Sequence, residues 1–186
     1  AAALAYMMIS QQDPVGLVTF DTKLGANVPP RSRRSQLPTI LSQLTKLKAE
    51  GKTDLAGSLI QLAAMLRNRS LVMLFSDLLT EEGPMLKALR NLRHAGHDVI
   101  VFHVLDEAEV TFPFQGSLQL HDPESGASEP VRAADAAEAY RKTIQEFRDR
   151  LDRELSESRI DYVPLDTSMQ FDKALMEYLV SRRGRY

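Results

Sequence analysis

The stretch Leu71-Val72-Met73-Leu74-Phe75-Ser76-Asp77 decides the predicted fold, because five apolar residues in a row are followed by a hydroxyl and a carboxylate. An apolar run without alternation is typical of a strand that is buried on both faces of a parallel sheet. Ligands of open α/β sheets bind beyond the carboxyl ends of the strands. Asp77 would lie at such an end, so it is the first candidate for a functional residue.

Strands and helices alternate on both sides of this stretch. Further strands are predicted at 15–20, 24–28, 98–106 and 160–165, with Pro29-Pro30 ending the second of them. Helical spacing of apolar residues predicts helices at 1–12, 37–47, 133–158 and 171–179, and others that begin near Thr53-Asp54 and Glu81. This alternation predicts a three-layer α/β/α, Rossmann-like fold with a mostly parallel sheet.

The helical pattern lapses between residues 107 and 132. Two short extended segments there flank Asp122-Pro123-Glu124-Ser125-Gly126, a sequence that favours a hairpin turn. We interpret this region as a hairpin insertion and residues 1–186 as a single domain.

Composition excludes several classes of function. The 186 residues are 44% hydrophobic and 26% charged, with a net charge of −2, so no basic surface for nucleic acid is expected. No cysteine is present, which excludes disulfides and thiolate zinc sites and fits a reducing compartment; we therefore expect a cytoplasmic location. No apolar run reaches the roughly 20 residues that span a bilayer, so no membrane segment is expected.

The first residues predict a helix that is already under way. Ala1 to Ile9 carry helix-forming residues, and no capping residue precedes them. We therefore expect the numbered chain to be the C-terminal part of a longer protein.

Oxygen donors are the remaining candidates for chemistry. The sequence has no glycine-rich dinucleotide or phosphate-binding motif and no zinc spacing of histidines, and His103 is expected to be a hydrogen-bonded core residue. The polar groups at predicted strand ends or at a helix start are Asp21, Thr53, Asp54, Ser76, Asp77 and Asp106. Such hard donors suit Mg²⁺, which keeps several waters and takes few carboxylates. The alternative is that these acids only cap helices.

The segments 13–20, 51–59, 69–78, 96–106 and 160–168 together resemble the von Willebrand factor A-like (vWA) domain, and more narrowly the bacterial DUF58 family. The resemblance implies an adhesion-type metal site in which Thr53 and Asp77 are ligands of Mg²⁺, with Ser76 and Asp54 supporting them. The family's first metal loop, Asp-x-Ser-x-Ser, does not occur in this chain. The resemblance places it upstream of Ala1, with a central first strand that would lie between the strands at 15–20 and 71–76.

The resemblance also implies a function. Members of the family act with MoxR-type AAA+ ATPases in assembling or activating other proteins, so we expect a non-enzymatic protein-binding module. One alternative is a Mg²⁺-dependent phosphohydrolase or phospho-acceptor domain that uses Asp77, although Asp106 stands where an acceptor domain would want a lysine. Another is a vWA-like scaffold that binds protein without metal.

Overall fold

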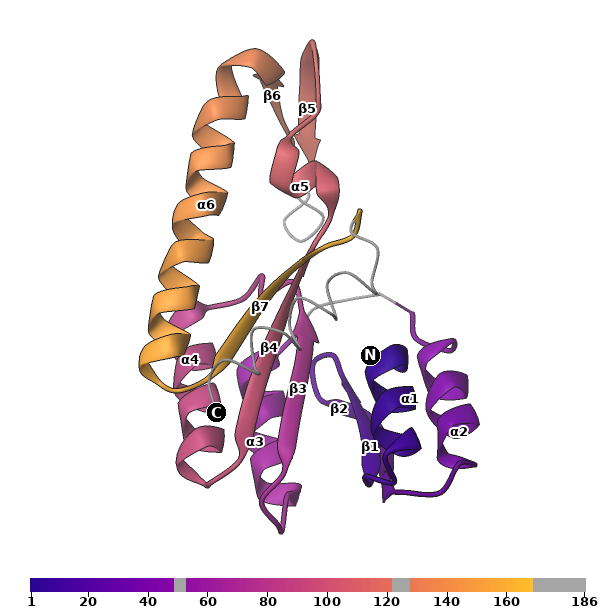
Figure 1. Cartoon of the computed structure of the whole chain (residues 1–186). Coiled ribbons are helices and arrows are strands. Elements are labelled where there is room, and N and C mark those ends of the chain that lie inside the picture. Colours follow the sequence, from indigo (N-terminus) through magenta and orange to yellow (C-terminus); the bar gives the residue numbers. More distant parts are fainter. Residues whose placement is uncertain (49–52, 122–127, 169–186) are drawn as a thin grey trace. The chain divides into compact units, whose positions relative to one another are not determined.

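The computed structural model describes residues 1–48, 53–121 and 128–168, which form two compact units. The first unit consists of residues 1–69 and 80–95, and the second of residues 70–79 together with the described residues from Gly96 onward. Figure 1 labels the elements of both units. The helix predicted at 171–179 lies outside the described residues.

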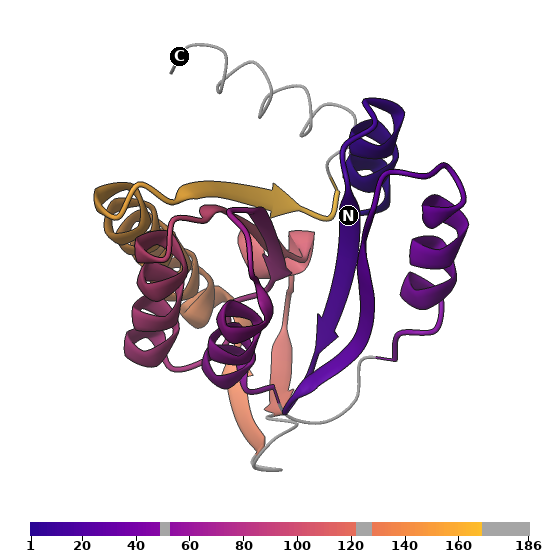
Figure 2. The ribbon, with the colours of Figure 1, turned by 90° about the horizontal axis from the view of Figure 1, so that it is seen from below.

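The first unit begins with a helix, a hairpin and a second helix. These are α1 (Ala2–Ser10), the antiparallel strands β1 (Val15–Phe20) and β2 (Leu24–Arg31), and α2 (Gln36–Leu44). Their apolar residues form one core, which contains Ala5, Ile9, Val28 and Ile40. The helix α3 (Leu55–Met65) packs beside α4 (Glu82–His94) in the same unit, as Figure 2 also shows.

The hairpin continues through the two prolines that were expected to end it. β2 reaches Arg31, and the pairing shifts between Val15 and Leu17, where Pro29 and Pro30 lie on the opposite strand without N–H groups. The side chain of Gln36, at the start of α2, donates from Nε2 to the carbonyls of Val15 (2.9 Å) and Pro29 (2.8 Å). The prediction of a strand that stops at residue 28 was wrong because this amide supplies N–H donors where the prolines have none.

The start of α3 was predicted correctly. Asp54 is its N-cap residue and accepts a hydrogen bond from the backbone N–H of Gly57 at 2.8 Å. A Cβ at position 57 would collide with the Asp54 carboxylate, so glycine there keeps the cap intact.

The second unit contains the predicted parallel sheet. Its strands are β3 (Leu71–Ser76), β4 (Asp98–Leu105) and β7 (Asp161–Asp166), in the order β3-β4-β7. Both pairs are parallel, and the rings of Phe75 and Phe102 stack at 4.6 Å between neighbouring strands. The buried strand is β4, whereas β3 is mostly half-buried and pairs with a strand on one side only among the described residues. The prediction that β3 is buried on both faces was therefore wrong.

A hairpin and a long helix complete the second unit. After the short α5 (Glu107–Thr111), the strands β5 (Ser117–His121) and β6 (Ser128–Arg132) pair antiparallel and lead into α6 (Ala133–Glu157). Leu151 and Leu155 of α6 are fully buried. The antiparallel hairpin and the long helix are confirmed. The prediction that residues 107–132 contain no helix was wrong at α5, because the reciprocal cap between Asp106 and Glu109 starts a short helix that apolar spacing does not reveal.

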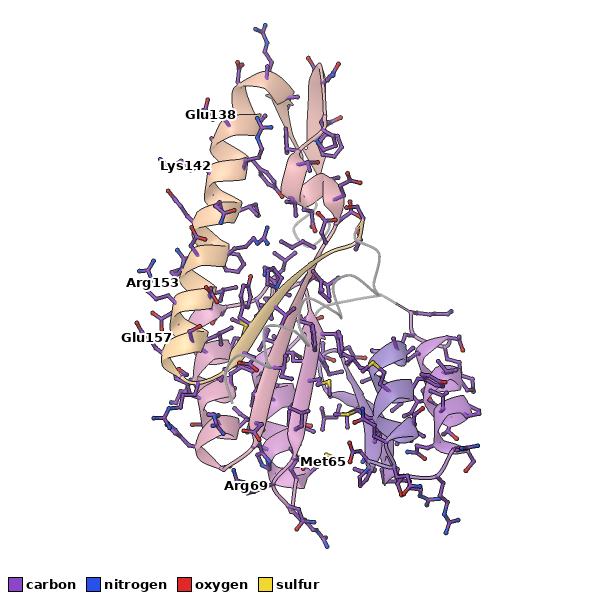
Figure 3. The ribbon with its side chains drawn as sticks, viewed as in Figure 1. Met65, Arg69, Glu138, Lys142, Arg153 and Glu157 are labelled. Atoms are coloured by element: carbon purple, nitrogen blue, oxygen red, sulfur yellow. The ribbon has the colours of Figure 1, made fainter. Side chains whose placement is uncertain are left out.

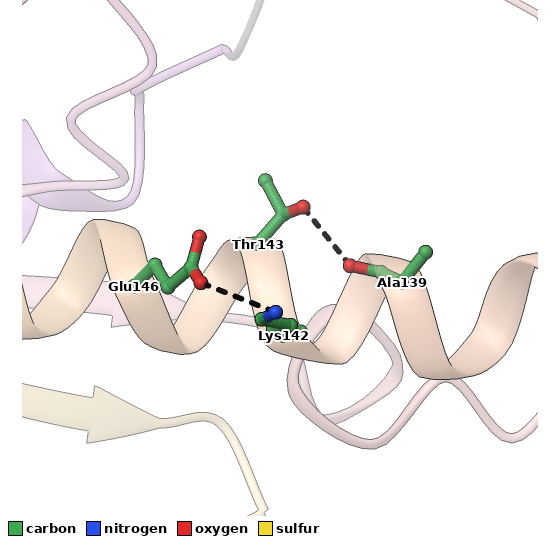
Figure 4. Close-up of polar contacts among 4 residues, drawn as sticks. All are labelled: Ala139, Lys142, Thr143 and Glu146. Atoms are coloured by element: carbon green, nitrogen blue, oxygen red, sulfur yellow. Dashed lines mark hydrogen bonds and ion pairs between the residues drawn. The ribbon is translucent and has the colours of Figure 1, made fainter.

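The outer face of α6 is charged. Glu138, Lys142, Arg153 and Glu157 point away from the sheet in Figure 3. Figure 4 shows the exposed ion pair between Lys142 and Glu146 at 3.9 Å, together with the hydrogen bond that the Thr143 hydroxyl donates to the Ala139 carbonyl at 2.9 Å. Both side chains of this pair are mostly exposed, so it contributes only about 0.3–0.5 kcal/mol. None of the described helices has both the length and the apolar character needed to cross a membrane.

Candidate functional site: the Asp77 loop

The four predicted site residues fall into two pairs. Thr53 and Asp54 precede α3 in the first unit, where both are exposed, while Ser76 is the last residue of β3 and Asp77 follows it in the second unit. Within residues 1–48, 53–121 and 128–168 there is no group of three or more His, Cys, Asp or Glu side chains that could hold a metal ion. The metal site that would combine Thr53 with Asp77 stays a prediction.

The loop Asp77-Leu78-Leu79 lies at the carboxyl end of β3. Oδ1 of Asp77 accepts a hydrogen bond from the backbone N–H of Leu79 at 3.2 Å and one from the Ser76 hydroxyl at 3.5 Å. The Ser76 hydroxyl oxygen in turn accepts the N–H of Leu78 at 3.1 Å. The Ser76 hydroxyl thus contacts both the Asp77 carboxylate and the Leu78 backbone, and the Asp77 side chain remains exposed.

The two leucines of this loop have opposite environments. Leu78 is 1% exposed and has a φ of 56°, which is rare for a leucine, while Leu79 is 66% exposed. The loop therefore anchors one apolar side chain inside the protein and presents the next one to solvent, beside the Asp77 carboxylate.

His103 of β4 lies behind the loop and is fully buried. Its Nε2 is 2.9 Å from the carbonyl oxygen of Asp77, and its Nδ1 is 2.6 Å from the hydroxyl of Tyr162 on β7. A carbonyl can only accept, so Nε2 carries the proton and Nδ1 accepts from Tyr162. The prediction of a hydrogen-bonded core histidine is confirmed.

Tyr162 and Arg148 of α6 extend this line of hydrogen bonds. The Arg148 side chain is hydrogen-bonded to Tyr162, and its positive charge is close to His103. Burial lowers the pKa of His103 below its usual value, which the hydrogen bond to the Asp77 carbonyl partly opposes and the Arg148 charge reinforces. His103 is therefore neutral at pH 7.

Burial has the opposite effect on tyrosine. It raises the pKa of Tyr162 from 10.0 to about 12 and outweighs the Arg148 charge. The folded chain keeps this proton at a pH at which the unfolded chain has lost it, so the contribution of Tyr162 to stability is present below pH 10 and is lost as the pH rises toward 12.

We expect that Tyr162→Phe removes the step at the highest pH from the absorbance titration of the five tyrosines. A wild-type chain in which Tyr162 titrates with the exposed tyrosines would contradict this prediction.

The other predicted acids have structural roles. Asp21 lies in the turn between β1 and β2, where its Oδ1 accepts a hydrogen bond from the backbone N–H of Lys23. This hydrogen bond lowers the pKa of Asp21. Asp106 caps α5 in a reciprocal arrangement with Glu109 and also accepts the Thr167 hydroxyl at 3.2 Å. Asp54 and Asp106 thus both cap helices, and the support of a metal ligand by Asp54 stays a prediction.

The sequence interpretation did not select Tyr162 or Arg148. Tyr162 is one residue of a predicted strand, and Arg148 is one of many charges on a long helix. Pairing of β7 with β4 aligns Val101 with Tyr162 and His103 with Pro164, and only this register reveals the contact.

Comparison with known proteins agrees with this architecture. A family model described as "Protein of unknown function DUF58" matches residues 1–153. The chain belongs to the DUF58 family. A search of curated proteins found no match to this DUF58 chain.

Two solved structures have a fold similar to that of this DUF58 chain. The conserved hypothetical protein BatB from Bacteroides thetaiotaomicron aligns with 100% of this chain and 87% of its own, with a TM-score of 0.58 and 16% identity. An aerotolerance-related membrane protein from Bacteroides fragilis aligns with 95% of this chain and 86% of its own, with a TM-score of 0.55 and 17% identity. At these identities the similarity shows the fold alone, which is vWA-like. The described residues of this chain combine a parallel three-stranded sheet with two antiparallel hairpins.

Proposed function

We propose that this DUF58 chain is a non-enzymatic protein-binding domain and that the Asp77 loop contacts its partner. The observation that carries the proposal is the exposed carboxylate of Asp77, which hydrogen bonds fix beside the exposed Leu79. A fixed charge next to an apolar anchor is a common composition of protein interfaces.

The nearest histidine supports binding rather than catalysis. Both ring nitrogens of His103 are engaged by Tyr162 and by the Asp77 carbonyl, and the side chain has no exposure to solvent. A general base must reach the proton that it removes. This argues against a phosphohydrolase that would use His103 as the base beside Asp77.

The partner in this proposal is a MoxR-type AAA+ ATPase, as the family resemblance implies. Mg²⁺ belongs to the proposal as well, with Asp77 as a ligand and Thr53 as the second. The donors fit the ion in chemistry, because a carboxylate and a hydroxyl are hard oxygen ligands, and both side chains are exposed. When bound, the ion would supply a positive charge for an acidic side chain of the partner.

Three finer expectations stay with this proposal. They are the three-layer arrangement, the further strand between those at 15–20 and 71–76, and a cytoplasmic location.

The test is to measure binding of a MoxR-type ATPase with and without Mg²⁺, using Asp77→Asn. We expect the affinity of the variant for the ATPase to fall by a factor of about thirty or more. The reason is that removing one charge of a buried interfacial pair costs about 2 kcal/mol or more. Asp135→Asn makes the same chemical change at an exposed position of α6 and serves as the matched control. Thr53→Ala reports separately on the second proposed ligand.

Wild-type affinity in Asp77→Asn would contradict the proposed role of the loop. Loss of binding in Asp77→Asn without any dependence on Mg²⁺ would support the alternative of a scaffold that binds protein without metal. Covalent phosphate on wild-type protein after incubation with a phosphate donor, absent from Asp77→Asn by intact mass, would establish the phospho-acceptor alternative instead.

A further inference from the structure

We infer that His103 and Tyr162 are positioning residues that connect helix α6 to the Asp77 loop and set the direction of the Asp77 carboxylate. The inference rests on the proposed function of that loop. It assigns a role to the hydrogen bonds that join Tyr162, His103 and the Asp77 carbonyl, which protein binding by itself does not require.

The peptide group between Asp77 and Leu78 is held at both of its polar ends. Its oxygen accepts from Nε2 of His103 at 2.9 Å, and its N–H donates to the Ser76 hydroxyl at 3.1 Å. Fixing both ends of a peptide fixes the rotation of its plane. The carboxylate of Asp77 and the N–H of Leu79 that binds it are attached to either side of this plane.

The loop also has an unfavourable backbone conformation that must be held. Leu78 has a φ of 56°, and this left-handed conformation is unfavourable for a residue with a Cβ. Such conformations persist where the surroundings determine them. The hydrogen bond from His103 is one of the contacts that hold this one.

The line of donors has a fixed direction that continues to the long helix. Arg148 has no acceptor atoms and therefore donates to the Tyr162 hydroxyl. The hydroxyl donates to Nδ1 of His103, whose Nε2–H donates to the Asp77 carbonyl. Every group in the line thus has one role, and reversing one bond would leave a buried polar group without a partner.

The imidazole of His103 also packs against helix α6. The ring of Phe147, the residue before Arg148 on α6, lies edge-on to the ring of His103 with centroids 5.8 Å apart. A displacement of α6 would therefore reach His103 through both Phe147 and Arg148. We infer that the loop follows the position of this helix.

The first test compares two amide substitutions that replace the two imidazole nitrogens separately. The amide nitrogen of His103→Gln lies near the position of Nε2 and can still donate to the Asp77 carbonyl, whereas that of His103→Asn lies near Nδ1 and cannot. We expect amide hydrogen exchange of Leu79 to become about tenfold faster in His103→Asn, which corresponds to one hydrogen bond. In His103→Gln it should stay within about twofold of wild type.

Equal exchange at Leu79 in the two variants would overturn the inference, because His103 would then only fill space. If neither variant folds, the NMR signals of the His103 ring nitrogens in the wild-type chain decide between the two possibilities. An Nε2-protonated neutral imidazole supports the donor line, and an Nδ1-protonated one overturns it.

Tyr162→Phe provides a second variant that keeps the ring. Removing the hydroxyl leaves Nδ1 of His103 and the Arg148 side chain without their shared partner. We expect faster exchange at Leu79 and about tenfold weaker partner binding, with Asp77 itself unchanged. Unchanged exchange would overturn the role of Tyr162.

The exchange measurements need no partner, so they separate the two proposals. If Asp77→Asn binds the partner as tightly as wild type does, the proposed function is contradicted. Amide exchange at Leu79 then still decides whether His103 positions the loop. Faster exchange in His103→Asn together with unchanged partner binding would show that the loop is positioned but is not the binding surface.

Discussion

Gln36→Glu is expected to destabilise the first unit by about 3–5 kcal/mol at neutral pH, the range for a buried charge that is left without compensation. Gln36 is 5% exposed, and its Nε2 donates to the carbonyls of Val15 and Pro29. A glutamate would place carboxylate oxygens against these two carbonyl oxygens, so two hydrogen bonds would be replaced by repulsion.

The same variant should recover at low pH. Burial near carbonyl oxygens raises the pKa of a glutamate in the folded state above its unfolded value of about 4.3. The penalty is therefore present at neutral pH and is lost as the pH falls through the folded pKa, where the protonated acid can donate to one carbonyl. Urea unfolding of the variant at neutral and at acidic pH measures this difference.

Two controls separate the charge from the missing donors. Gln36→Leu leaves the carbonyls unpaired but adds no charge, so its cost should be about 1–3 kcal/mol and independent of pH. Gln61→Glu changes an exposed glutamine of α3 and should stay within about 0.5 kcal/mol. Equal stability of Gln36→Glu and Gln36→Leu at neutral pH would contradict the proposed bonding of the amide.

Leu78→Ala is expected to cost about 2–5 kcal/mol, because it leaves a cavity at a side chain that is only 1% exposed. The variant Leu78→Gly should be equally stable to within about 0.5 kcal/mol, although glycine normally costs roughly 0.5–1 kcal/mol more than alanine. The reason is the φ of 56°, which glycine adopts without the penalty that a Cβ incurs.

Leu79→Ala is the matched control for this pair. Leu79 is the next residue in the chain but is 66% exposed, so its truncation should leave the free energy of unfolding within about 0.5 kcal/mol. Thermal or urea unfolding of the three variants measures the comparison. A glycine variant that is about 1 kcal/mol less stable than the alanine variant would mean that Leu78 has ordinary backbone geometry in solution.

Local signals in the sequence were sufficient for most elements. The apolar runs at 71–75 and 99–102 predicted two strands of the parallel sheet, and Asp54 before an apolar stripe predicted the start of α3. Helical spacing predicted α6 to within one residue at its end. These predictions succeeded because periodicity, capping and turn chemistry act over a few neighbouring residues.

The continuation of β2 through two prolines could not be predicted in the same way. It depends on Gln36, whose amide reaches back to both strands of the hairpin. The half-buried state of β3 likewise depends on which strands pair with it, and its own apolar run does not contain that information.

The sequence by itself determined that Asp77 ends an apolar strand, that Ser76 precedes it, and that His103 lies inside another strand. Only the tertiary structure decided what these residues do together. The register of β3, β4 and β7 brings the Asp77 carbonyl, His103 and Tyr162 into one line of hydrogen bonds across residues that are 26 and 59 positions apart. Hydrogen bonds act over about 3 Å, so a contact between such distant positions exists only after the strands have paired.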